Sequence, residues 1–433
     1  MKTVKPSRIL AIILAAVLAI GMAGCADTSA QNAPSSQTAP PAQTAAPAQN
    51  EPEAPAEPGS LVIMAPTEIK EYLDTLKPGF EAETGIELFV IAREQGDINQ
   101  GIPLDGPAGI GPDVFFSNYN RLAGFVDSEL VDEYPLPEGR YSDLVAEKTT
   151  IDGKTYGAPI NMDSYFLIYN KDLLPEPPKT FAELEALSED PFYAEGDRST
   201  AFLAPFIAPA IFQGILVGFG GYIFGDNGKN PDDIGLNSPG AIEAARYVKS
   251  WFDRWPAGMI DPRADILIKD LFIAGKTAAY IGGSWDWGQV QDSGINLGAA
   301  KIPTLPNGNE TMYDSGGRGW FLSNYSKNKE GARLLMDYLT TEENQELLFD
   351  MASLIAASAA AQENLKKRND QMVNAVVEQT QFSVPMPKIP EISEYNALFF
   401  DVYFEIFAGT KDIQQGLDDG VQSYRDIIQQ KYR

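Results

Sequence analysis

A strand, a helix and a second strand predicted between residues 61 and 91 constrain the fold more than any other feature of the sequence. Leu61-Val62-Ile63-Met64 is a short apolar run with strand character. Apolar side chains then recur at helical spacing from Ile69 to Phe80, and Gly85 suits the end of that helix. A second strand is predicted over residues 86–91. Two strands joined through one helix pair in parallel, so a parallel sheet is expected.

The same alternation continues to the C-terminus. Further strands are predicted over 113–116, 166–169 and 276–282, and further helices from 181, from 239 to 252, and over 264–274, 341–350, 401–407 and 413–430. Thr180 and Glu183 form a capping box, Ser238 precedes a proline that suits the first helical position, and Thr340 with Glu343 caps another helix. The fold class is therefore predicted to be α/β.

The N-terminus has the pattern of an export signal. Lys2, Lys5 and Arg8 precede the uncharged run Ile9–Ile20, which is short for a bilayer span. Small residues then lead to Cys25, as in the lipobox of bacterial lipoproteins. This resemblance implies that residues 1–24 are a signal peptide, and that lipid on Cys25 anchors the chain to the extracytoplasmic face of the cell membrane. A secreted protein without lipid, or a buried helix, is the alternative.

Residues 25–59 are expected to form a tether. Residues 26–59 contain no aromatic side chain and no Leu, Ile or Val. Such a segment buries too little apolar area to offset the entropy of ordering its backbone. As a flexible coil, this length would span roughly 30 Å, and its prolines would extend it further.

The rest of the chain contains no cysteine and the whole chain contains no histidine. Disulfides are therefore excluded, as are Ser-His-Asp triads, Cys-His nucleophiles and zinc sites of the usual Cys/His kind. Any catalysis would have to use Asp, Glu, Lys, Tyr or backbone groups, and we expect no cofactor and no metal.

The charge balance is strongly acidic, with 60 Asp and Glu residues against 33 Lys and Arg residues. Such a surface repels nucleic acid. It also repels an anionic membrane surface, so the lipid on Cys25 would have to supply the membrane attachment.

Trp285-Asp286-Trp287 follows the predicted strand 276–282, where open α/β sheets place their ligands. An indole face stacks on the C–H surface of a sugar, and a neighbouring carboxylate accepts hydroxyl hydrogen bonds. The alternative is that one tryptophan is a core residue and the other is half-exposed.

Three other motifs are less specific. The glycine-rich segment 315–320 allows close approach to a ligand or a hinge, or is a plain loop before a strand. The glycines of 218–221 lack the spacing of a nucleotide-binding loop. Asp226, Gly228, Asn230 and Asp232 alternate as in a calcium loop, but Asn237 occupies the twelfth position, so a polar turn is predicted.

Several segments together resemble the maltose/maltodextrin-binding proteins of bacterial extracellular solute-binding family 1. The matching segments are Gly111–Phe116, Phe166–Thr180, Gly220–Phe224, Gly282–Trp287 and Met386–Pro390. Their order and approximate spacing also match, and the resemblance covers the chain from about residue 60 to the C-terminus.

The resemblance implies two α/β lobes that close on a ligand, with no enzymatic turnover. The chain would cross between lobes near Asn161, over 304–316 and near residue 365. One lobe would contain 60–161 and 317–365, and the other 162–316 and 366–433. The family also implies a monomer that delivers an oligosaccharide to the membrane subunits of an ABC importer.

Ligand contacts carry over unevenly from the family pattern. Trp285 matches a stacking tryptophan, Asp163 an interlobe carboxylate, Asn120-Arg121 an Asp-Arg pair, Met386 a pocket-lining methionine and Glu68 a ligand carboxylate on the first strand.

Other family positions differ. Ser117 replaces a stacking aromatic, Ala208-Pro209-Ala210 an aromatic Glu-Pro-Tyr site, and Asn396 a second tryptophan. Tyr395 could partly replace that second tryptophan, Arg318 and Trp320 could refill the cleft, and Trp287 is a further candidate for ligand contact.

The predicted function is therefore binding of maltose, maltodextrin or a related oligosaccharide for import. A non-sugar solute on the same fold, a surface glycoside hydrolase with a carboxylate pair, and an adhesin-like lipoprotein are the alternatives.

Overall fold

The computed structural model describes residues 59–194, 200–256, 258–261, 263–314 and 316–433. The chain divides into two units, Met1–Pro52 and Glu53–Arg433, and all described residues belong to the second. The predicted signal peptide, Cys25 and the predicted tether up to residue 58 lie outside the described residues, as does Ser315.

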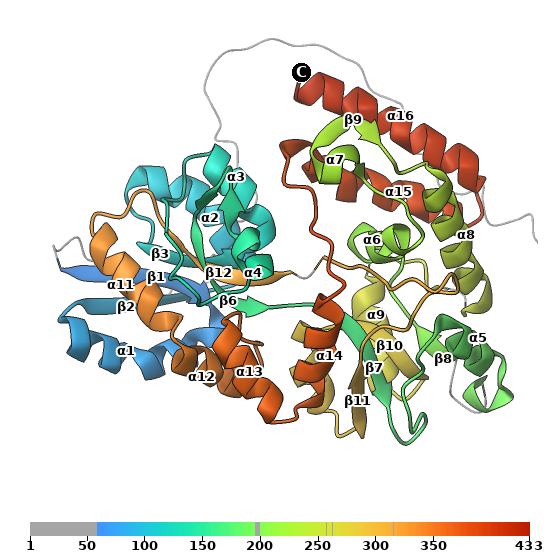
Figure 1. Ribbon diagram of the computed structural model, residues 1–433, viewed down its shortest axis with the longest axis horizontal. Coiled ribbons are helices and arrows are strands. Elements are labelled where there is room, and N and C mark those ends of the chain that lie inside the picture. The colour runs from blue at the N-terminus through green and yellow to red at the C-terminus, as the bar shows by residue number, and fades with distance from the viewer. Residues whose placement is uncertain (1–58, 195–199, 257, 262, 315) are drawn as a thin grey trace, which may run out of the picture. The chain divides into compact units, whose positions relative to one another are not determined.

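One sheet has five strands in the order β2-β1-β3-β12-β6 (Figure 1). These strands are β1 (Ser60–Pro66), β2 (Glu87–Arg93), β3 (Val114–Asn118), β6 (Gly157–Met162) and β12 (Gly317–Leu322). β1 pairs in parallel with β2 and β3, which confirms the predicted strand-helix-strand unit. β12 lies between β3 and β6 and is antiparallel to both, so the sheet as a whole is mixed rather than parallel.

The second sheet has four strands in the order β11-β7-β10-β8. They are β7 (Tyr165–Asn170), β8 (Thr200–Leu203), β10 (Thr277–Gly283) and β11 (Leu297–Ala300). β7 is antiparallel to β10 and β11, whereas β10 runs parallel to β8. The short strands β4 (Thr150–Ile151) and β5 (Lys154–Thr155) form a separate hairpin, and β9 spans Asn230–Ile234.

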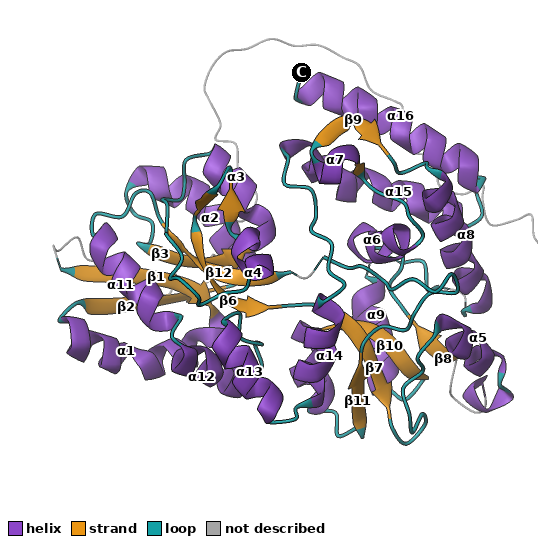
Figure 2. Cartoon of the chain, in the orientation of Figure 1, coloured by secondary structure: helices purple, strands orange, loops and turns teal. Residues whose placement is uncertain are grey.

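Helices cover both sheets (Figure 2). The α-helices are α1 (Lys70–Thr84), α2 (Gln95–Ala108), α3 (Leu122–Asp127), α4 (Asp143–Lys148), α5 (Phe181–Glu189), α6 (Pro209–Gly218), α7 (Gly225–Gly228), α8 (Pro239–Arg254), α9 (Ala264–Ile273), α10 (Trp287–Gln291), α11 (Lys329–Leu339), α12 (Glu342–Ala352), α13 (Ala359–Lys367), α14 (Gln371–Thr380), α15 (Tyr395–Phe407) and α16 (Ile413–Lys431). Short 3-10 helices are η1 (Thr67–Ile69), η2 (Tyr119–Arg121), η3 (Pro191–Ala194), η4 (Ser284–Asp286) and η5 (Pro390–Glu394). Within the described ranges, none of these helices has the length and apolar character needed to cross a bilayer.

The observed helix ends agree with the caps predicted from the sequence, with two corrections. Gly85 adopts a left-handed conformation with φ 70° and closes α1, as predicted. The Thr180 hydroxyl accepts from the Glu183 N–H, but the Glu183 carboxylate accepts from Lys179 rather than from the cap residue itself. The cap of α12 is the hydroxyl of Thr341, which accepts from Asn344 N–H, and not Thr340.

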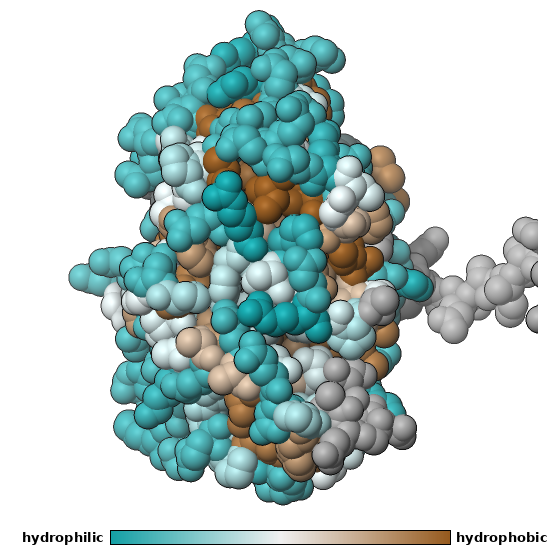
Figure 3. Space-filling model, turned by 90° about the vertical axis from the view of Figure 1, so that its right-hand side faces the viewer, coloured by the Kyte–Doolittle hydropathy of each residue, from teal (hydrophilic) through white to brown (hydrophobic). Residues whose placement is uncertain are grey.

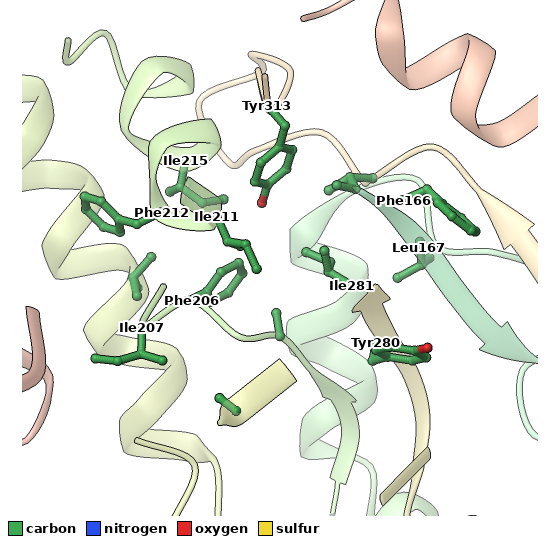
Figure 4. Close-up of a cluster of buried hydrophobic side chains, with 14 of the residues drawn as sticks. Phe166, Leu167, Phe206, Ile207, Ile211, Phe212, Ile215, Tyr280, Ile281 and Tyr313 are labelled. Atoms are coloured by element: carbon green, nitrogen blue, oxygen red, sulfur yellow. The ribbon is translucent and has the colours of Figure 1, made fainter. Parts of the chain in front are cut away.

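Each sheet has its own hydrophobic core. Buried side chains of α1, α11 and α12 pack on the five-stranded sheet. A larger cluster joins β7 and β10 to α6, α8, α15 and α16. Figure 4 shows part of that cluster, in which Phe166, Ile281 and Ile211 lie among the same group of side chains. Figure 3 shows one outer face, on which hydrophilic side chains predominate and hydrophobic ones form small patches.

The chain passes between the sheets through connections of different length. It leaves the five-stranded sheet after Met162 and enters the four-stranded sheet at Tyr165. It returns between Ala300 and Gly317. Later, α14 packs against β7 and β11 of the four-stranded sheet. The assignment of these parts to two closing lobes stays a prediction.

Candidate functional site

The carboxylate of Asp163 lies in the two-residue connection between β6 and β7 and is 8% exposed. Its Oδ1 accepts hydrogen bonds from Asn161 Nδ2 and from Ser284 Oγ, and each bond is 2.9 Å long. Asn161 belongs to β6 of the five-stranded sheet, and Ser284 directly follows β10 of the four-stranded sheet. One buried carboxylate oxygen therefore ties together residues from both sheets.

Arg318 of β12 lies beside the other oxygen of that carboxylate. Its Nε is 3.5 Å from Asp163 Oδ2, and its Nη1 donates to Glu68 Oε1 over 3.0 Å. The guanidinium carbon lies 5.5 Å from the centroid of the Phe116 ring, which is the distance of a cation–π contact. The backbone N–H of Arg318 donates to Asn161 Oδ1. Arg318 thus joins two carboxylates that belong to different segments of the chain.

Trp285 follows Ser284 in η4 and is 51% exposed. Its ring meets the Tyr165 ring edge to face, with centroids 5.1 Å apart. The indole also lies directly over Gly283, where a Cβ atom would come within 2.2 Å of the ring. Glycine at 283 is therefore required for the indole to lie against the end of β10 while one part of it faces solvent.

A pocket with a cavity volume of about 130 Å³ opens beside Trp285. Its apolar wall is made by Pro205, Ile207, Ala208, Ile211, Ala264, Tyr280, Ile281, Gly282 and Gly283, and its polar lining by Tyr165, Asp265 and Asp286. This volume is smaller than the ~300–1,000 Å³ of typical ligand pockets, but the mainly apolar wall with a few convergent polar groups is a feature that such pockets share.

The pKa values of two polar residues that line the pocket, Asp286 and Tyr165, are raised. Burial raises the pKa of Asp286, while Lys269 Nζ, 3.1 Å from Asp286 Oδ1, opposes that rise. Burial, and then the carboxylates of Asp265, Asp286 and Asp163, raise the pKa of the Tyr165 phenol. The phenol is therefore protonated at neutral pH and able to donate a hydrogen bond.

Three predicted ligand residues are core residues. Trp320 is fully buried against Phe116, with ring centroids 5.0 Å apart. Tyr395 is fully buried, and its hydroxyl donates to Pro209 O. Trp287 is 4% exposed and packs on Phe166. β12, α10 and α15, which carry them, turn these rings toward the interior, and a role for them in ligand contact stays a prediction.

The remaining residues singled out by the family pattern have different surroundings. Asn120 and Arg121 are exposed in η2, next to Tyr119, whose buried hydroxyl donates to Asn161 O. Met386 is partly buried against the larger core cluster. Ser117 is buried, and its hydroxyl donates to Asn99 Oδ1, so it belongs to the interior. Ala208 lines the pocket, which its small side chain leaves open.

Several residues of the site were not predicted: Ser284, Tyr165, Asp265 and Lys269. A signal existed for two of them, because Asp265 and Lys269 stand one helical turn apart on the predicted helix 264–274. Ser284 carried no signal beyond its position beside Trp285. Tyr165 belongs to β7 and was hidden within an apolar run.

The acidic turn near residue 226 is a polar turn. Asp226 and Asn227 both have φ 52°, and Gly225 bridges to Asn230. Across the residues that the structure describes, no three His, Cys, Asp or Glu side chains gather in a way that could hold a metal ion.

Known proteins resemble this chain over most of its length. A maltodextrin-binding protein of Bacillus subtilis, MdxE, is 36% identical over 428 residues, which cover 98% of each chain. A galactooligosaccharide-binding protein of the same species is 30% identical over 382 residues, which cover 86% of this chain and 90% of that protein.

The fold also matches solved structures. The maltose-binding periplasmic protein MalE of Listeria monocytogenes, in complex with maltose, superposes with a TM-score of 0.81 at 40% identity. The match covers 86% of this chain and 99% of that one, which confirms the predicted α/β class. The profile of a family described as bacterial extracellular solute-binding protein matches residues 77–375, more than half of the sequence. The chain therefore belongs to the bacterial extracellular solute-binding protein family.

Proposed function

We propose that this protein captures maltose, maltodextrin or a closely related oligosaccharide outside the cytoplasm and delivers it to an ABC importer. The observation that carries this proposal is the half-exposed indole of Trp285, which lies at the mouth of a pocket and one residue from the Ser284–Asp163 hydrogen bond. The maltodextrin-binding relative and the maltose complex support the same ligand class.

The chemistry of the lining suits a neutral sugar. The apolar face of a pyranose ring would stack on the Trp285 indole, and its hydroxyls would donate to Asp265, Asp286 or the free side of Asp163. The protonated Tyr165 phenol would donate to a sugar oxygen. We assign Glu68, Asn120, Arg121 and Met386 to the outer parts of the same site, as the family pattern predicts.

Transport would use closure of two lobes, formed by 60–161 with 317–365 and by 162–316 with 366–433. Ligand binds better to the closed arrangement, so it shifts the population toward that state, and the permease subunits would recognise it. Lipid on Cys25 would hold the protein at the membrane, and neither nucleic acid nor a second copy of the chain is required.

Calorimetry with a panel of sugars tests this function. We expect maltotriose to bind and to raise the unfolding temperature, because a ligand of the native state stabilises it by mass action. No binding by any glucose oligomer would contradict the proposal. Tighter binding of galactooligosaccharides would instead favour the second relative's ligand class.

The same samples separate a binding protein from a hydrolase. Incubation with maltotriose should leave the sugar intact, whereas new reducing ends would indicate a glycoside hydrolase.

A further inference from the structure

Arg318 is the one arginine in the described part of the chain that lies within ion-pair distance of both Glu68 and Asp163. Its side chain is 12% exposed, whereas that of Glu68 is 59% exposed. Of the two ion pairs that Arg318 makes, the one with Asp163 is therefore buried and the one with Glu68 faces solvent.

The two oxygens of Asp163 have different surroundings. Oδ1 already accepts from both Asn161 and Ser284, while Oδ2 faces Arg318 at 3.5 Å without a hydrogen bond. Among the described residues, Nε of Arg318 has no hydrogen-bond partner although it is buried. Oδ2 and Nε thus attract each other electrostatically, and the Nε–H of Arg318 makes no hydrogen bond among the described residues.

This geometry has a consequence for the charge of a ligand. Two carboxylates so placed would attract an ammonium group strongly if no cation stood between them. Arg318 occupies that position, and its delocalised guanidinium is held by the Phe116 ring and by the strand backbone. A neutral hydroxyl can still donate to either carboxylate, whereas an amine must approach a fixed positive charge.

We infer that Arg318 is a specificity-determining residue, which positions the Glu68 and Asp163 carboxylates for neutral sugar hydroxyls and excludes cationic amino sugars from them. This inference rests on the proposed function. Specificity of this kind comes from disfavouring the wrong ligand rather than from tighter contacts with the right one.

The test compares maltotriose with three single-amine maltotrioses, each carrying a primary amine at C6 of a different ring. Primary amines of this kind are charged at about pH 7. Affinities are measured by calorimetry for the wild type, Arg318→Met, Arg318→Lys and Glu68→Gln. The quantity compared is the ratio of amine-sugar affinity to maltotriose affinity in each protein.

We expect Arg318→Met to raise this ratio by about tenfold or more for at least one amine sugar, because two carboxylates lose their fixed cation. Arg318→Lys keeps the charge and should stay near the wild-type ratio. Glu68→Gln should lower the ratio, because Arg318 then has only one carboxylate to neutralise. Opposite shifts in these two variants are a signature that a purely structural arginine would not produce.

The controls separate the possible failures. Arg333→Met removes an arginine of α11 that pairs with Asp132, and it should leave every ratio unchanged. Glu68→Gln alters an exposed side chain, so it tests the inference even if Arg318→Met does not fold. Ratios within about twofold of the wild type in both variants would overturn the inference alone. A wild type that binds no maltotriose would overturn the proposed function and the inference with it.

Discussion

The hydroxyl of Ser284 donates to Oδ1 of Asp163 over 2.9 Å, although 121 residues separate the two in the sequence. The bond joins the connection after β6 to the end of β10. It also fixes Ser284, the residue before Trp285, relative to the five-stranded sheet, because Asn161 of β6 donates to the same oxygen of Asp163. The position of the residue before Trp285 and that of the five-stranded sheet are therefore linked through the side chain of Asp163.

Ser284→Ala should weaken both stability and sugar binding. A hydrogen bond to a charged group contributes about 1.5–3 kcal/mol, so the free energy of unfolding should fall by that amount. Urea unfolding and calorimetry with maltotriose measure the two effects. Ser188→Ala, which removes a hydroxyl bonded only to Leu184 O within its own helix, should change neither clearly.

Trp285→Ala should separate binding from stability. The side chain is half-exposed, so its loss should barely change the unfolding temperature. As the stacking anchor, it should contribute about 2 kcal/mol or more to sugar affinity. Phe404→Ala removes another exposed aromatic ring, on α15, and should leave affinity unchanged. Equal affinity of wild type and Trp285→Ala would remove Trp285 from the site.

Gly283→Ala should displace the indole of Trp285, against which Gly283 lies. The new Cβ would lie 2.2 Å from the indole, so Trp285 must move. Overpacking of this kind costs about 1–3 kcal/mol of stability, and maltotriose affinity should fall with it.

Gly288→Ala is the matched control for Gly283→Ala. Nothing lies within 4 Å of a Cβ at Gly288, which is a helical position in α10. There the substitution should be neutral, or stabilising by up to about 1 kcal/mol. A stable, fully binding Gly283→Ala protein would contradict the placement of the ring.

Asp286 should make stability depend on pH in a defined direction. Burial raises its pKa above the ordinary value of 3.8, so the folded state holds the proton more tightly than the unfolded state does. Its contribution to stability is therefore present in acid and is lost as the pH rises through the raised pKa.

The comparison with Asp286→Asn isolates this contribution. Relative to that variant, the wild type should gain stability as the pH falls from about 7 toward 4, as measured by urea unfolding at each pH. A difference that stays constant would show that the Lys269 ion pair offsets burial, and a difference that moves the other way would show that it outweighs burial.

Local patterns in the sequence predicted a large part of the fold. The helical spacing from Ile69 to Phe80, the left-handed Gly85 and the parallel pairing of β1 with β2 all depend on residues close together in the chain, and all are confirmed. The insertion of β12 between β3 and β6 was not predicted, because pairing between such distant segments leaves no local pattern.

The candidate site was harder to predict for the same reason. Trp285 and Trp287 are equivalent as sequence, yet one is half-exposed and the other is buried on Phe166. Which ring faces outward depends on the turn after β10 and on Gly283. The Asp163–Ser284 contact joins positions that nothing in the local sequence relates to one another.

The position of β12 also determines the order in which the chain can fold as it is synthesised. The four-stranded sheet comes from residues 165–300, so it can be completed as soon as β11 is available. The five-stranded sheet begins at residue 60 but cannot close until Leu322 has arrived. Until then β3 has one unpaired edge and β6 has no partner strand, and such exposed edges favour pairing with other chains. The sheet whose first strand comes earliest in the chain is therefore the last to be completed.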